Sequence, residues 1–183
     1  MLPEFVIYTM ALDTAYSQKS PDKFAITFAG ITRSGVYVQL GEQAYNNRDL
    51  VKSLAPSDIP PLLEAYAEAQ RQMWGLSRDI FIDNADQATI AECAKYKNRT
   101  GTLYNFPGAW KKTKIIDRIH LQRGWMATGH WRMLDTCTGT IEEMNSYSWK
   151  DDKYEPQDGG DHFINSGQYG WLPFKSRIGD AGK

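Results

Sequence analysis

Three aspartates stand at positions where their carboxylates could act together. Asp13 follows an apolar run at residues 5–12, Asp83 follows a short predicted strand at residues 79–82, and Asp161 precedes His162 at the start of a helical pattern. Phosphodiester hydrolysis with two divalent ions requires carboxylates from separate elements, because hard oxygen ligands suit Mg²⁺ and Mn²⁺. The pattern therefore predicts a metal site built from these acids.

Each aspartate also has an ordinary explanation when it is taken alone. Asp13 and Asp83 would then be turn residues, and Asp161 would be a helix cap. The carboxyl ends of strands in an open α/β sheet adjoin the crevice where ligands bind. Because all three acids lie on elements that this fold would use for a site, a shared metal site is favoured over three unrelated turn and cap roles.

The elements that must position these acids begin with three predicted strands. The apolar run at residues 5–12 is nearly continuous, which predicts a central strand buried on both faces. Residues 23–32 and 36–40 are rich in β-forming types and flank a turn at Gly35, which predicts a hairpin.

Helices and strands alternate after this hairpin. Apolar spacing predicts a helix over residues 57–73, then a buried strand at 79–82, then a helix capped by Asp86. The remaining predicted elements are a strand at 102–106, a helix at 113–122, a short strand at 125–128, a helix at 133–149 and a final helix at 161–169. This order predicts an α/β fold of the ribonuclease H-like type, with a mixed central sheet and helices on both faces. We expect one domain over residues 1–175 and a loose tail over 176–183.

The composition sets limits on the class of protein. Among 183 residues, 42% are hydrophobic and 23% are charged, which supports a packed globular core. Cys93 and Cys137 are far apart, which argues against a zinc site and a disulfide scaffold. Because no apolar run approaches the roughly 20 residues of a membrane span, we expect no membrane partner and a cytoplasmic location.

A net charge of −1 predicts that any nucleic acid would be bound by a local basic patch rather than by the whole surface. The densest basic stretch contains Lys111, Lys112, Lys114 and Arg118. Such a stretch is either a solvated face or a set of phosphate contacts that hold duplex DNA without reading its sequence.

Several segments together resemble the C-terminal nuclease of tailed-phage large terminase subunits. The resemblance lies in residues 82–92 (IDNADQATIAE), 112–119 (KTKIIDRI), 141–150 (IEEMNSYSWK) and 155–169 (EPQDGGDHFINSGQY). In that family the first of these segments follows the second catalytic strand. The last corresponds to a Glu-Pro-x-Asp loop followed by a helix that begins with histidine. The resemblance extends from Asp13 to Tyr169.

The resemblance implies a metal-dependent endonuclease that cuts concatemeric double-stranded viral DNA during genome packaging in the host cell cytoplasm. It implies two Mg²⁺ or Mn²⁺ ions roughly 4 Å apart. It also implies an ATPase domain elsewhere in the full-length protein, with the small terminase subunit and the portal as partners. No phosphate-binding G-x-x-x-x-G-K-[ST] motif occurs in this sequence, so the resemblance covers the nuclease portion.

One residue departs from the family pattern. The third metal-binding aspartate of the family, three residues after the histidine, corresponds to Asn165. An amide oxygen can contact a metal but adds no charge. We therefore expect Asp13, Asp83, Asp161, His162 and Asn165 to form the site, with either Asn165 or Asp161 as the third metal ligand. The alternatives are another ribonuclease H-like nuclease, such as a Holliday-junction resolvase, and a DNA-binding domain with an impaired nuclease site.

Overall fold

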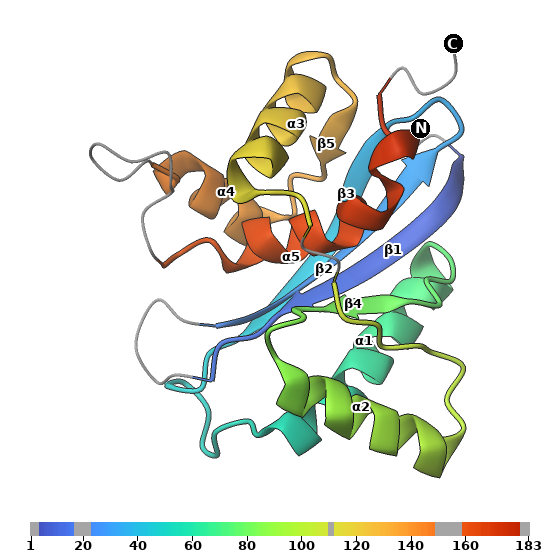
Figure 1. Cartoon of the computed structure of the whole chain (residues 1–183), viewed down its shortest axis with the longest axis vertical. Helices are drawn as coiled ribbons and strands as arrows, with labels where there is room; N and C mark the ends of the chain where they lie inside the picture. The colour runs from blue at the N-terminus through green and yellow to red at the C-terminus, as the bar shows by residue number, and fades with distance from the viewer. Residues whose placement is uncertain (1–3, 17–22, 110–111, 149–158, 180–183) are drawn as a thin grey trace.

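The fold is built on a five-stranded mixed sheet with the strand order β4-β1-β2-β3-β5 (Figure 1). This is a computed structural model that describes residues 4–16, 23–109, 112–148 and 159–179. Strands β1 (Phe5–Asp13), β2 (Phe24–Thr32) and β3 (Tyr37–Tyr45) form an antiparallel meander. Strand β4 (Ile80–Ile82) lies parallel to β1 at one edge, and β5 (Trp131–Met133) lies parallel to β3 at the other. The predicted mixed sheet is confirmed.

Helices cover both faces of this sheet, as the sequence predicts. The helices are α1 (Ile59–Met73), α2 (Gln87–Thr100), α3 (Ile115–Ala127), α4 (Thr138–Ser146) and α5 (His162–Trp171), with short 3-10 turns η1 (Pro56–Asp58) and η2 (Leu172–Arg177). Figure 1 shows α1 and α2 on one face, and α5 on the other with α3 and α4 beyond it. None of the helices in the described ranges is both long and apolar enough to cross a membrane.

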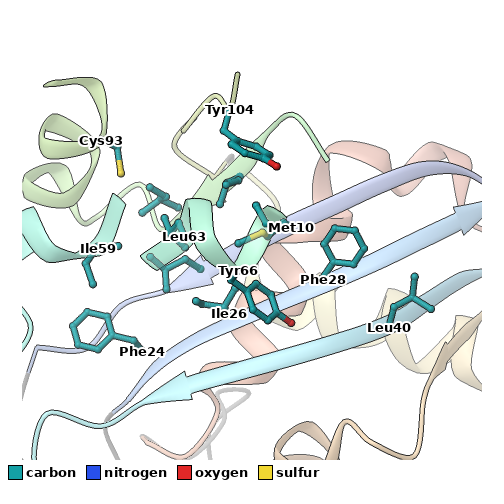
Figure 2. Packing of buried hydrophobic residues seen from close by; sticks show 14 of the residues in the cluster. Met10, Phe24, Ile26, Phe28, Leu40, Ile59, Leu63, Tyr66, Cys93 and Tyr104 are labelled. Atoms are coloured by element: carbon teal, nitrogen blue, oxygen red, sulfur yellow. The ribbon is translucent and has the colours of Figure 1, made fainter. Parts of the chain in front are cut away.

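Alternating strand residues supply two separate hydrophobic cores. Met10 and Leu12 of β1 face α1 and α2, where they pack with Leu63 and other large apolar side chains (Figure 2). Ala11 of β1 belongs to the second core, which includes Trp171 of α5. Both faces of β1 are therefore buried, which explains why its sequence is apolar at nearly every position.

Local signals in the sequence correctly predict the first half of the chain. Gly35 lies in the β2–β3 turn with φ 79°, a conformation that residues with a Cβ rarely adopt. The Asp86 carboxylate accepts a hydrogen bond of 3.0 Å from the backbone N–H of Thr89 and so caps α2.

The second half differs from the sequence prediction at several elements. Residues 102–106 do not form a continuous strand, because this segment pairs with the β4 region only at Asn105 and Gly108. Residues 125–128 form the end of α3 and not a strand. The short strand in this region is β5, which begins three residues later at Trp131. The ring of Trp125 packs edge-on against Trp171 at 5.0 Å, and this contact places residue 125 on a helix facing the core.

Two boundaries also differ. The helix expected over residues 133–149 is the shorter α4, and residue 149 lies outside the described residues. The tail expected to be loose from Ser176 is held as far as Gly179. Ile178 is buried in the second core, and the backbone N–H of Gly179 donates to the carbonyl of Gly35 at 2.9 Å.

Candidate active site

Asp13 and Asp83 lie side by side at the carboxyl ends of neighbouring strands. Leu12 of β1 pairs in parallel register with Ile82 of β4, and the backbone N–H of Asp83 donates to the Leu12 carbonyl at 3.3 Å. The next residue on each strand therefore presents its carboxyl group at the same edge of the sheet. Burial raises the pKa of Asp13, and the nearby charges of Asp83 and Asp161 raise it further, against the lowering effect of His162.

His162 is joined directly to Asp13. Its Nδ1 lies 2.8 Å from Oδ2 of Asp13, and both side chains are buried. Burial lowers the pKa of His162, but the hydrogen bond and charge of Asp13, together with Asp161 and Glu143, outweigh burial and raise the pKa overall. The first residue of α5 is thus fixed to the end of β1.

Asp83 has a different set of partners. Its Oδ1 accepts a hydrogen bond from the backbone N–H of Ala85 at 2.8 Å, so its ordinary role in the turn is present as well. Its Oδ2 accepts a 3.2 Å hydrogen bond from the hydroxyl of Tyr169, a buried residue of α5. Sequence reasoning assigned no role to Tyr169 beyond its place at the end of the last matching segment, because the contact spans 86 residues.

Glu143 holds the start of the helix that carries these contacts. Its Oε2 accepts hydrogen bonds from the backbone N–H groups of Phe163 at 2.8 Å and Ile164 at 3.1 Å. Its Oε1 forms an ion pair of 2.8 Å with Lys23. A carboxylate at a helix N-terminus satisfies N–H groups that have no partner within the helix. Asp161, at the N-cap position, makes no such side-chain bond, so the ordinary explanation of Asp161 as a cap does not hold.

Asp161 and Asn165 form a pair one helical turn apart at the start of α5. Burial raises the pKa of the half-buried Asp161, while His162 and a hydrogen bond from the Asn165 side chain lower it. The backbone N–H of Asn165 also donates to the carbonyl of Asp161 at 2.8 Å. Within the described part of the chain, no hydrogen bond joins Asn165 to Asp13 or Asp83.

The acids suit a divalent cation in their chemistry, although they do not form a complete ligand set. No three His, Cys, Asp or Glu side chains of residues 4–16, 23–109, 112–148 and 159–179 are grouped closely enough to hold a metal ion. Asp13 and Asp83 still bring two carboxylates together at one sheet edge, where the charge of Asp83 raises the pKa of the buried Asp13. A hard cation between them would relieve this repulsion, so the two oxygen donors fit such an ion.

The structure separates the four basic residues that we expected to bind DNA. Lys112 and Lys114 are exposed, and Lys111 lies outside the described residues. Arg118 does not belong to an exposed stripe, because only 7% of it is accessible. Its guanidinium acts electrostatically on Asp161 and Tyr169, which places this cation near the acids instead of on the outer surface.

Comparison with known proteins supports the fold through structure alone. The sequence matches no protein-family model and no curated protein. The structure is similar to the large terminase from a thermophilic bacteriophage, with a TM-score of 0.73 and 18% identity over 97% of this chain. The chain spans 41% of that large terminase.

Two isolated nucleases have the same architecture. The large terminase nuclease from thermophilic phage G20c, solved with bound magnesium, gives a TM-score of 0.59 and 13% identity over 91% of this chain and 80% of that one. The human cytomegalovirus terminase nuclease domain gives a TM-score of 0.52 and 13% identity over 72% of this chain and 66% of that one. The chain therefore has the ribonuclease H-like fold of these nucleases.

Proposed function

We propose that this chain is the nuclease domain of a large terminase subunit, a metal-dependent endonuclease that cuts concatemeric double-stranded viral DNA during packaging. The observation that carries the proposal is the placement of Asp13 and Asp83 at adjacent parallel strand ends. The ribonuclease H-like fold is shared with two terminase nucleases, and one of these was solved with bound magnesium.

Asp13 and Asp83 would hold the divalent ions, either Mg²⁺ or Mn²⁺. When bound, a pair of such ions supplies an activated water and neutralises charge on the leaving oxygen of a phosphodiester. The third ligand would come from the start of α5, where Asn165 and Asp161 are one turn apart. Asn165 offers an amide oxygen and Asp161 a carboxylate.

Residues of α5 orient the two carboxylates. His162 holds one oxygen of Asp13, and Tyr169 donates to one oxygen of Asp83. A carboxylate has about four acceptor positions, so these bonds restrict its rotation and still leave it able to bind a cation. Glu143 fixes the first turn of α5 and thereby the position of His162.

DNA would be held through its phosphates by Lys112 and Lys114, together with Lys111. A full-length protein would add the ATPase that drives DNA into the capsid, with the small terminase subunit and the portal as partners. The match to only 41% of the phage large terminase is consistent with such additional domains.

The experiment is Mn²⁺-dependent nicking of supercoiled plasmid by the Asp13→Asn and Asp83→Asn variants. Both substitutions preserve side-chain volume but remove a charged ligand, so cleavage should fall to background while thermal melting shows a folded protein. Asp49→Asn is the matched control, because Asp49 is exposed and pairs only with its neighbour Arg48 among the described contacts. Undiminished nicking in both site variants would exclude the assignment.

A second candidate function is a DNA-binding domain whose nuclease site no longer works. Asn165 favours it, because a neutral amide replaces the charged ligand that the terminase resemblance implies. Such a domain would bind duplex DNA in a salt-dependent manner but show no cleavage at any Mn²⁺ concentration. A third candidate is another ribonuclease H-like nuclease, such as a Holliday-junction resolvase. A resolvase would cleave branched DNA in preference to duplex.

A further inference from the structure

A cavity of about 330 Å³ is lined by residues of α3, α4 and α5. Figure 1 shows these three helices on the same face of the sheet. Its walls are largely apolar and include Ile119 of α3, Met144 of α4 and Ile164 of α5. This volume is at the lower end of the range of roughly 300–1,000 Å³ for small-molecule sites. The cavity has room for one ring-sized group.

Three polar side chains interrupt the apolar wall. Gln122 and Gln168 are 6% and 1% exposed, and Tyr147 is half-buried. The Oε1 atoms of both glutamines and the hydroxyl of Tyr147 have no hydrogen-bond partner within the structure as described. An unpaired buried polar atom costs free energy, and three that line one cavity are economically explained by a ligand that pairs with them.

Positive charge flanks the same cavity. Arg123 lines it directly. Arg118, one helical turn before Gln122, is not part of the cavity wall, and its buried Nε and Nη1 have no hydrogen-bond partner among the described residues. Asp161 and Arg118 act oppositely on Tyr147, so the exposed Arg123 supplies the positive charge at the cavity wall and favours an anionic ligand.

We infer that this cavity binds one unstacked nucleotide of a DNA strand, with the base between the apolar walls and the phosphate against Arg123. The inference rests on the proposed nuclease function, which supplies DNA as the ligand. The exocyclic amino group of adenine or cytosine has two N–H donors, one for each glutamine oxygen, whereas thymine offers only its single ring N3–H. Because α5 carries both Gln168 and His162, a nucleotide held here would fix the strand relative to Asp13 and Asp83.

The test is an NMR titration of the chain with dCMP, dAMP and dTMP in the absence of metal. Backbone amides of Gln122 and Gln168 should shift, and dCMP and dAMP should bind about tenfold more tightly than dTMP. Arg123→Gln should weaken binding of dCMP more than binding of deoxycytidine, which lacks the phosphate.

The Gln122→Leu and Gln168→Leu variants separate ligand binding from structure. Each should lower the affinity for dCMP by about tenfold, while the melting temperature stays the same or rises because an unpaired buried amide is replaced by an apolar group. Gln70→Leu is the matched control. Gln70 of α1 is 7% exposed, its Oε1 also lacks a partner in the described chain, and it lies on the opposite face of the sheet. This variant should bind dCMP as the parent does.

Equal affinity for dCMP and dTMP, unchanged affinity in Gln168→Leu, or tighter binding of indole than of any nucleotide would each overturn the inference. Plasmid nicking by the parent chain distinguishes the two proposals. Nucleotide binding without Mn²⁺-dependent nicking would support the cavity assignment and exclude the nuclease function. Nicking without nucleotide binding would support the nuclease and exclude the cavity as a nucleotide site.

Discussion

The two faces of the sheet are built from different kinds of contact. The face under α1 and α2 is filled by large apolar side chains such as Met10, Phe28 and Leu63 (Figure 2). The face under α5 also has an apolar core, and it adds directed hydrogen bonds between α5 and β1. Thr9 Oγ1 donates to the Gly170 carbonyl at 2.8 Å, and Ser166 Oγ donates to the Ala11 carbonyl at 2.9 Å.

This difference suggests that the α1 face mainly stabilises the fold, whereas the α5 face fixes the position of the helix at the candidate site. Apolar packing is non-directional, so the α1 face can tolerate small shifts of the helix, whereas hydrogen bonds at fixed lengths specify where α5 lies. The helix that holds Asp13 and Asp83 through His162 and Tyr169 is the one with directed contacts. The site is therefore on the face where geometry is determined most closely.

The largest effect on stability is expected from Leu63→Ala on the α1 face. Leu63 is fully buried, and its truncation should lower the free energy of unfolding by about 2–5 kcal/mol through lost transfer energy and a new cavity. Urea unfolding measures this change. Cleavage by the folded fraction should equal that of the parent, and Leu62→Ala, at a half-buried neighbouring position, should cost less. A loss of cleavage beyond the loss of folded protein would mean that the faces are not separable.

Glu143→Ala should have a somewhat smaller effect on stability but a large effect on cleavage. Its removal leaves the N–H groups of Phe163 and Ile164 without an acceptor and should cost about 2–3 kcal/mol. The first turn of α5 should fray and release His162 from Asp13, so Mn²⁺-dependent nicking should fall as well.

Glu142→Ala on the same helix is the control, because Glu142 is exposed. Glu143→Gln, which keeps one acceptor oxygen, should recover part of both losses. Full nicking activity in a destabilised Glu143→Ala variant would show that the cap supports the fold without positioning the site.

Features encoded by nearby residues could be predicted from the sequence. The apolar run of β1, the turn at Gly35 and the Asp86 cap each depend on residues within a few positions, and all were predicted correctly. The pairing of His162 with Asp13 spans 149 residues. This pairing could be predicted only in outline, because the order of elements and the terminase resemblance placed both residues at one candidate site.

The remaining features depend on how helices dock. The Glu143 cap requires α4 to lie against the start of α5, and no local pattern encodes this arrangement. Residues 125–128 have the composition of a strand, but the packing of Trp125 against Trp171 favours the helix. In the sequence Arg118 resembles part of a basic surface, because its spacing along a helix does not show which face of α3 is buried. In each case tertiary packing overrides the local preference.

Asn165→Asp should change stability little and activity more. The new carboxylate would face Asp161 one turn away, and such a like-charge pair costs only about 0.2–0.5 kcal/mol without metal. With Mn²⁺ the added charge should tighten binding, measured by calorimetry, and raise plasmid cleavage. Asp161→Asn in this background should have the smaller effect. If Asn165→Asp changes neither quantity and Asp161→Asn abolishes cleavage in the parent, Asp161 is the third ligand.

The smallest effect on stability is expected from replacing Lys112 and Lys114 together by glutamine. Both residues are exposed, so the free energy of unfolding should change by less than about 0.5 kcal/mol. If both contact phosphates, the dependence of log K on log salt should become shallower by roughly 0.9 per lost contact, equally for all duplex sequences. The control replaces Lys52 and Lys95, two exposed lysines on the α1 and α2 side, and should leave the slope unchanged. Equal slopes for both double variants would mean that duplex DNA does not distinguish the two sides of the molecule. Lys112 and Lys114 would then be part of a solvated surface, and the DNA path would have to be sought elsewhere around Asp13 and Asp83.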